Sequence, residues 1–323
     1  MKRREFITVL GSAAVWPLAA RSQSPKIPRI GYLCFRSPSS ADDAFFASLR
    51  SLGWVEGQNI FIDRRFVSGD TQRLKDSAAA LVNLKVDLIM ACASVSTEAA
   101  KSATASIPIV FAAAGDPVGQ KFIESLAHPG SNVTGTSFDA GPEITTKQIQ
   151  LLLQIVPKAR RIAILWNPTS PFIRTYWEAA QGAASALRVS FHSEEITDSK
   201  DFESAFEEIG RDRADALIVL SDGFMTTNRV TLVRLAAKHK LPTMYGHNLY
   251  AEAGGLLSYG PSLHDLYRNA ASYVDKVLRG SKPAQLPVQQ PVKFDLIINL
   301  KVAKALGLTI PTAVLDAADR VIE

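Results

Sequence analysis

Residues 109–137 read IVFAAAGDPVGQKFIESLAHPGSNVTGTS, and this stretch divides the chain into two similar halves. The apolar run from Ile109 to Ala114 predicts a buried strand, which Asp116 and Pro117 end in a tight turn. A short helical segment is expected around residues 121–127, followed by a turn-rich link and a β-branched strand that ends near Ser137. We interpret the stretch as a strand with a polar end, followed by a hinge between two lobes.

Short apolar runs alternate with helical patterns on both sides of this stretch. The runs lie near residues 30–35, 60–67, 86–91, 161–167, 189–196, 216–220 and 242–246. The segments between them carry apolar residues three or four positions apart, as amphipathic helices do. Strands that alternate with helices form parallel sheets through right-handed crossovers. The sequence therefore predicts an α/β protein of two doubly wound lobes, and 323 residues suffice for two domains.

The first 22 residues have the pattern of a secretory signal peptide. Arg3 and Arg4 precede an apolar run from Phe6 to Ala20, and small residues stand at its end. The arginine pair resembles the twin-arginine export motif. A membrane anchor is the weaker alternative, because Arg21 ends the run before the roughly 20 apolar residues that span a bilayer. We expect residues 1–22 to be removed and the mature protein to be periplasmic.

The charge of the chain comes largely from this leader. The chain has 36 basic and 31 acidic residues, and 32 and 30 are left without residues 1–22. A small net charge without a basic cluster does not predict a nucleic-acid or anionic-membrane surface. The five histidines lack metal-ligand spacing, and nucleotide-binding and nucleophile motifs are missing. We expect no metal, no cofactor and no nucleic-acid partner.

Cys34 and Cys92 are the two cysteines of the chain. Both lie near the ends of predicted strands that would be neighbours in a doubly wound sheet. A single disulfide formed in an oxidising compartment is one alternative. Two buried free thiols are the other, and the one we favour.

Polar and aromatic residues gather at the carboxyl ends of the predicted strands, where open α/β sheets bind their ligands. No nucleophile among them is paired with an evident base. These candidate ligand-binding residues are Phe35, Ser94, Ser96, Thr97, Asp116, Asn167, Asp222 and Tyr245.

Each candidate has a plain structural alternative. The hydroxyls between Ser94 and Thr97 stand at a predicted helix start and would favour a carboxylate, or they only cap the helix. Asp116 and Asp222 would accept an ammonium group, or they only stabilise turns. Tyr245 would stack on an aromatic ligand, or it only packs in the core.

Four motifs occur in an order that resembles a known family. They are GWVEGQN at residues 53–59, DPVG at 116–119, HPGSNVTG at 128–135 and WNP at 166–168. With them, the chain from about Ile30 to Pro311 resembles the ABC transporter substrate-binding proteins that include tryptophan and tyrosine binders.

The resemblance implies a type I periplasmic binding fold, with two Rossmann-like lobes joined by three strands. The crossings would fall near residues 134–137, 256–260 and 287–292. The first lobe would comprise residues 27–136 and 258–286, and the second residues 137–257 and 287–323.

The resemblance also implies roles for single residues. Hydroxyls matching Ser94, Ser96 and Thr97 would take a ligand carboxylate, and an acid matching Asp116 or Asp222 would take its amine. Further contacts would come from Ser137 and Asn167. The chain departs from the family in the loop after the first strand, residues 35–38, where Arg36 would favour a ligand without an amine. Aromatic and other carboxylic acids therefore stay open beside amino acids.

The function that follows is the solute-binding component of an ABC importer. A monomer without catalytic activity would bind an amino acid or an aromatic or branched acid between its lobes and deliver it to a membrane permease. One alternative is a secreted enzyme that uses Asp116 or Asp222 as acid or base. The other is the ligand-sensing core of a regulator, against which the export signal and the missing DNA-binding headpiece argue.

Overall fold

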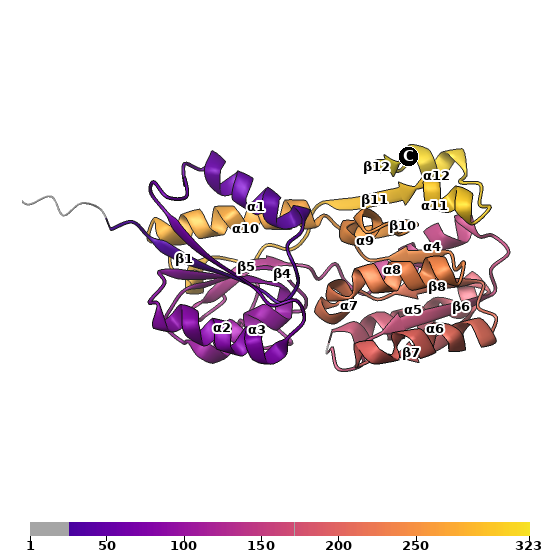
Figure 1. Ribbon diagram of the computed structural model, residues 1–323, viewed down its shortest axis with the longest axis horizontal. Helices are drawn as coiled ribbons and strands as arrows, with labels where there is room; N and C mark the ends of the chain where they lie inside the picture. The colour runs from indigo at the N-terminus through magenta and orange to yellow at the C-terminus, as the bar shows by residue number, and fades with distance from the viewer. Residues whose placement is uncertain (1–25, 171) are drawn as a thin grey trace, which may run out of the picture.

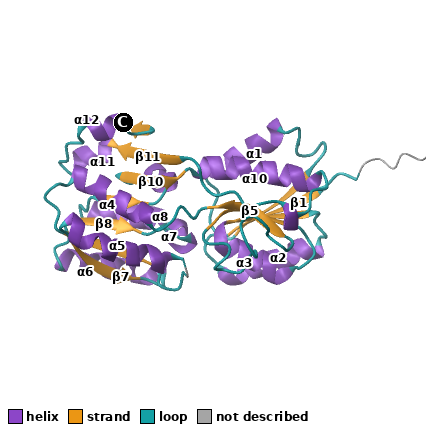
Figure 2. Cartoon of the chain, turned by 180° about the vertical axis from the view of Figure 1, so that it is seen from behind, coloured by secondary structure: helices purple, strands orange, loops and turns teal. Residues whose placement is uncertain are grey.

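The computed structural model describes residues 26–170 and 172–323, so the expected signal peptide at residues 1–22 lies outside the described residues. Two lobes lie side by side along the long axis of the molecule (Figure 1). Each lobe is a sheet with helices on both faces (Figure 2). Within the described residues, no helix combines the length and the apolar character that crossing a membrane requires.

The first lobe contains a five-stranded parallel sheet in the order β2-β1-β3-β4-β5. The strands are β1 (Arg29–Cys34), β2 (Phe61–Phe66), β3 (Leu88–Cys92), β4 (Ile109–Ala114) and β5 (Val133–Ser137). The helices of this lobe are α1 (Ser40–Ser51), α2 (Thr71–Asn83), α3 (Ala93–Ala103) and α10 (Leu263–Leu278), with a 3-10 turn η2 (Pro283–Gln285).

The side chains of these strands alternate between two apolar clusters, as the period of a strand requires. Ile30 and Met90 pack with α1 and α10 on one face of the sheet. Leu33 and Ile89 pack with α2 and α3 on the other face. Both faces are covered, which explains why β3 and β4 consist of buried residues throughout.

The second lobe contains a seven-stranded sheet in the order β12-β11-β10-β9-β8-β6-β7, and its neighbours are parallel except for the antiparallel pair β10 and β11. The strands are β6 (Arg161–Trp166), β7 (Ser190–Glu195), β8 (Ala216–Val219), β9 (Thr243–Tyr245), β10 (Leu257–Pro261), β11 (Phe294–Asn299) and β12 (Arg320–Ile322). The helices are α4 (Glu143–Ile155), α5 (Ile173–Leu187), α6 (Phe202–Arg211), α7 (Gly223–Thr227), α8 (Arg229–Lys238), α9 (Asn248–Glu252), α11 (Leu300–Ala305) and α12 (Thr312–Asp316), with η1 (Ser199–Asp201).

Three segments connect the lobes, and the lobe boundaries differ by a few residues from the expected ones. All of β5 up to Ser137 pairs with β4, so the first crossing follows residue 137. All of β10 up to Pro261 pairs within the second sheet, so residues 258–261 belong to the second lobe and the chain crosses after them. Gln289 still bridges to β5, so residues 287–289 stay with the first lobe and the third crossing follows residue 289, within the expected range of 287–292. In each case backbone pairing extends further than the side-chain pattern indicates.

The expected helical segment at residues 121–127 is wrong. The chain forms consecutive turns there, in which the Phe122 N–H bonds to the Pro117 carbonyl. Lys121 has a left-handed backbone conformation with φ 58°, which a right-handed helix excludes.

Cys34 and Cys92 form a disulfide, so the preference for two free thiols is wrong. The two residues face each other in the parallel register of β1 and β3. Their Cα atoms lie 4.9 Å apart, within the range that a disulfide spans. The bridge therefore joins the carboxyl ends of two adjacent strands of the first lobe. Cys92 also lines the space between the lobes.

Candidate functional site

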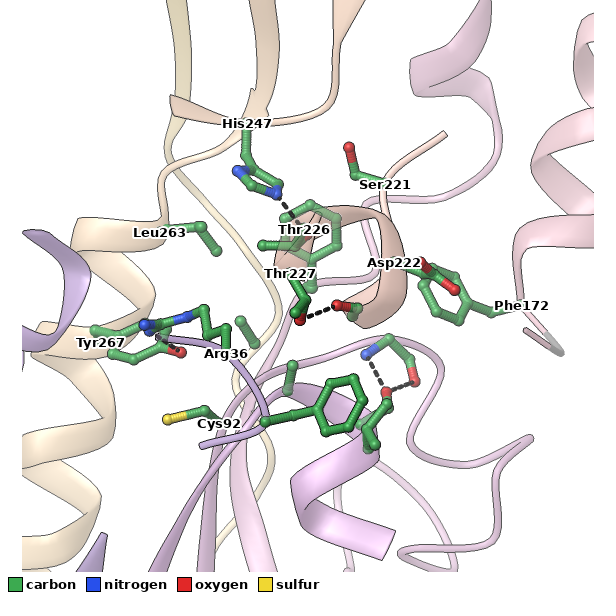
Figure 3. Close-up of a pocket in the computed structure, with 18 residues that line it drawn as sticks. Arg36, Cys92, Phe172, Ser221, Asp222, Thr226, Thr227, His247, Leu263 and Tyr267 are labelled. Atoms are coloured by element: carbon green, nitrogen blue, oxygen red, sulfur yellow. Dashed lines mark hydrogen bonds between the residues drawn. The ribbon is translucent and has the colours of Figure 1, made fainter. Parts of the chain in front are cut away.

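A cleft between the lobes lies at the carboxyl ends of the strands and has an empty volume of about 610 Å³, part of it open to solvent. Figure 3 shows Arg36 and Tyr267 on the side of the first lobe and Ser221, Asp222 and His247 on the side of the second. Much of the lining is apolar. The apolar side chains include Phe35, Val95, Phe138, Phe172 and Leu263.

The first lobe presents the N-terminal end of α3 to the cleft. Ala93 has φ 58°, which turns the chain sharply from β3 into this helix. Ser94 follows at the cleft surface, and its hydroxyl oxygen accepts hydrogen bonds from the Gly115 N–H at 3.1 Å and the Gln120 side chain at 3.0 Å. The free backbone N–H groups of a helix start favour a negatively charged ligand group.

Arg36 lies beside this helix, and its charge is already matched by a carboxylate. Its guanidinium donates two hydrogen bonds to Asp42, at 2.7 and 2.8 Å, and a third to the Tyr267 hydroxyl at 3.0 Å. Burial opposes the charged form of Arg36, but Tyr267 and Asp42 together raise its pKa above the ordinary value. Arg36 therefore stays charged and held in place, and is not a free counter-ion for a ligand.

The second lobe contributes Asp222 at the start of α7, on the edge of this lobe that faces the first (Figure 1). One carboxylate oxygen accepts the Met225 N–H at 2.8 Å and the other accepts the Asn167 amide at 2.8 Å. Burial raises the pKa of Asp222, and these hydrogen bonds oppose the rise. The carboxylate thus caps α7 and joins two loops of the second lobe.

His247 lies deeper in the wall of the second lobe. It is only 3% exposed, its Nε2 lies 3.0 Å from the Thr226 hydroxyl, and its Nδ1 has no hydrogen-bond partner among the described residues. Burial lowers its pKa to about 3, and the positive charges of Arg229 and Arg36 act in the same direction. The imidazole is therefore neutral at physiological pH.

We expect the buried neutral state of His247 to weaken the fold in acid. The unfolded chain binds a proton on this residue below about pH 6.5 and the folded chain does not, so the free energy of unfolding falls as the pH drops toward 3. The loss at pH 5 is about 2 kcal/mol. Urea unfolding of the wild type and of His247→Gln at pH 7 and pH 5 measures it. Equal pH dependence in the two proteins would show that His247 is protonated in the fold.

The two lobes touch each other around the cleft through glycines. A Cβ atom added to Gly115 in the first lobe would lie 2.7 Å from the Phe172 ring of the second lobe. One added to Gly223 in the second lobe would lie 3.1 Å from Val95 in the first. Such distances leave no room for a side chain, so the structure is a closed arrangement of the lobes.

The family model described as "ABC transporter substrate binding protein" matches residues 37–322 of the chain. The chain belongs to this family. It is 27% identical to a tyrosine-binding protein of Clostridioides difficile over 291 residues, which are 89% of this chain and 83% of that protein.

Two solved structures are similar to this chain in sequence and in shape. The ABC domain in complex with L-Trp from Streptococcus pneumonia has a TM-score of 0.82 and 28% identity, with 91% of this chain and 99% of that chain covered. The ligand-free, open structure of a Clostridium difficile substrate binding protein with adhesive properties has a TM-score of 0.66 and 25% identity, with 92% and 99% covered. The expected type I periplasmic binding fold is confirmed.

Four of the predicted site residues line the cleft or its continuation. Phe35, Ser94 and Asp222 line the cleft between the lobes described above, which we call the inner cleft. Asn167 lines an outer groove of about 1520 Å³ of open space, which shares Ser94 and Asp222 with the inner cleft. They follow the carboxyl ends of β1, β3, β6 and β8, which is the arrangement that the strand-end argument anticipates.

The other five predicted residues do not line the inner cleft. The Ser96 hydroxyl accepts the Phe35 N–H, and the Thr97 hydroxyl donates to the Ala93 carbonyl within α3. The Ser137 hydroxyl donates to the Ala114 carbonyl, and the Asp116 carboxylate accepts the Gly119 N–H in its own turn. Tyr245 is buried in the core, where its ring stacks on Tyr250 at 4.7 Å.

Several lining residues carried no sequence signal. Phe172 and His247 lie in loops of the second lobe. Tyr267 belongs to α10, which returns to the first lobe more than 100 residues after leaving it. Thr226 could have been found, because it lies four residues after Asp222, on one turn of α7.

Proposed function

We propose that this protein is the periplasmic solute-binding component of an ABC importer. It binds an aromatic or branched amino or carboxylic acid between its lobes and delivers it to a membrane permease as a monomer. The observation that carries the proposal is the closed cleft, with apolar side chains around a few fixed polar groups. Such a lining suits a small molecule with an apolar body and one polar end.

Closure of the lobes supports binding by a population shift. Phe172 and Val95 come from different lobes, so a ligand that contacts both is held only in the closed arrangement. The higher TM-score to the L-Trp complex than to the ligand-free, open structure, at similar coverage, fits a closed form. The closed form would be the one that docks on the permease.

Catalysis is the less favoured alternative. His247 lies next to the Thr226 hydroxyl, and this is the pairing that a nucleophilic mechanism would use. However, no acid orients Nδ1 among the described residues, and a pKa of about 3 makes His247 a poor base. A regulator core shares the bilobed fold, but the family match and the expected export signal favour transport.

A thermal-shift screen with amino acids and aromatic and branched carboxylic acids tests the proposal. A ligand at 100 times its dissociation constant adds about 2.7 kcal/mol to the free energy of unfolding, which raises the melting temperature by several degrees. We expect such a shift with at least one compound of this panel. Folded protein that no compound stabilises would contradict the proposal.

We expect the hydroxyls of α3 to differ in their effect on binding. Ser94→Ala removes a hydroxyl at the cleft surface and should weaken ligand binding by about fivefold, or roughly 1 kcal/mol. Thr97→Val removes a hydroxyl that donates within the helix and should leave the affinity within about twofold. Calorimetric titration of the wild type and both variants with the best ligand of the screen measures these two changes in affinity. Equal losses would place Thr97 in the binding site.

A further inference from the structure

The charged groups at the cleft bear on whether its ligand carries an amino group, and the inference drawn from them rests on the proposed function. An amino acid buried between the lobes needs an acceptor for its ammonium group, because burying an unpaired charge is costly. Among the described residues that line the inner cleft, Asp222 is the one acid.

Both oxygens of Asp222 are already used by the second lobe itself. They accept the Met225 N–H and the Asn167 amide, each at 2.8 Å, and these bonds cap α7 and hold the loop after β6. The Phe224 N–H and the Ser170 side chain also act on this carboxylate, so few of its roughly four acceptor positions are left for an ammonium group. The other acid at a strand end, Asp116, accepts the Gly119 N–H and does not line the cleft.

One cation lies close behind the cleft wall of the second lobe. Arg229 begins α8 and donates to the Thr226 carbonyl at 3.2 Å, behind a residue that lines the cleft. It forms no ion pair with any acid in the described part of the chain. Burial is the main cause of the low pKa of His247, and the positive charge of Arg229 acts in the same direction. The helix start at Ser94 contributes a partial positive charge on the side of the first lobe.

His247 provides a second, independent sign of a ligand group. Its imidazole lies in the wall of the cleft, almost completely buried, and its Nδ1 is unpartnered among the described residues (Figure 3). A buried polar atom without a partner is costly unless something supplies a hydrogen bond. A neutral imidazole can satisfy an oxygen or a hydroxyl of a ligand and brings no negative charge for an ammonium group.

We propose that the cleft selects a carboxylic acid with an apolar, ring-bearing body and no charged amino group. The carboxylate lies at the N-terminal end of α3 beside Ser94. The ring packs among Phe35, Val95 and Phe172. An amino group would meet a positive potential and a carboxylate that the protein already uses.

Matched ligand pairs test this selection in calorimetric titrations of the purified protein. The pairs are tryptophan with indole-3-propanoic acid, tyrosine with 3-(4-hydroxyphenyl)propanoic acid, and phenylalanine with 3-phenylpropanoic acid. We expect the acid of at least one pair to bind at least about tenfold more tightly than its amino acid. We also expect 3-phenylpropanamide to bind at least about tenfold more weakly than 3-phenylpropanoic acid, because it lacks the charge.

The outcomes separate the two proposals. Amino acids that bind as tightly as the acids, or more tightly, would overturn the selection and leave the solute-binding function standing. No binding of any panel member to folded protein would count against both.

Two variants test the electrostatic origin of the selection. Arg229→Gln should weaken acid binding several-fold, whereas Arg234→Gln, on the same helix but paired with Glu203, should not. Asp222→Asn removes a like charge and should tighten acid binding. A loss of at least about tenfold in amino-acid binding by Asp222→Asn would instead show that this carboxylate receives the amine, and would overturn the proposal.

Discussion

Gly115→Val is expected to lower ligand affinity by at least about 100-fold while the protein stays folded. Gly115 follows β4 in the first lobe, and a Cβ atom there would meet three atoms of the Phe172 ring at 2.7 to 2.9 Å. The ring belongs to the second lobe, so a larger residue holds the lobes apart without disturbing either core. If only about 1% of the molecules can close, the apparent dissociation constant rises 100-fold.

The control for this variant is Gly182→Val, in an exposed part of α5 with no neighbouring atom within 4 Å. It should leave the affinity close to that of the wild type. Truncating the obstructed ring by Phe172→Ala in the Gly115→Val protein should recover part of the lost affinity. Calorimetric titration of the four proteins gives the comparison. An unchanged affinity in Gly115→Val would mean that ligand binding does not require this contact between the lobes.

Asp42→Asn is expected to reduce the free energy of unfolding by about 3–5 kcal/mol, because it leaves the buried Arg36 guanidinium without its counter-charge. The Asp42 carboxylate accepts two bonds from Arg36, a bond from the Tyr32 hydroxyl at 2.5 Å and the Ser39 N–H at the start of α1. Its side chain is only 3% exposed. Urea unfolding at pH 7 measures the loss.

The double variant Arg36→Met with Asp42→Asn separates charge from packing. Without the unpaired cation, it should be more stable than Asp42→Asn alone, since neutral residues often replace a buried ion pair at little cost. If Asp42→Asn lowers the free energy of unfolding by less than about 1 kcal/mol, the buried ion pair of Arg36 and Asp42 does not stabilise the loop after β1 as we infer.

The sequence predicted the architecture because buried parallel strands and amphipathic helices are local patterns. Leu88 to Cys92 is apolar throughout because helices cover both faces of the sheet. The lobe boundaries shifted because they depend on backbone pairing, as with Gln289, which bridges to β5 from the last crossing. Side-chain patterns carry little information about such pairing.

The candidate site was predictable only where the strand-end rule applies. Ser94 reaches the cleft, but Ser96, two positions later, points about 200° away around the helix. Thr97 lies closer to the face of Ser94, but its hydroxyl donates to the Ala93 carbonyl of its own helix. Phe172 reaches the cleft by closure of one lobe on the other, and no local pattern encodes that contact. The pairing of Arg36 with Asp42 was likewise invisible, although the two residues are close in sequence.

Calorimetric titration of the wild-type protein with the amino-acid and carboxylic-acid panel tests the central claim most directly. We predict saturable binding of one molecule per chain by at least one panel member. A negative change in heat capacity should accompany it, because the closed lobes remove the apolar lining and the ligand's ring from water. Folded protein that gives no saturable heat with any member of the panel would contradict the account.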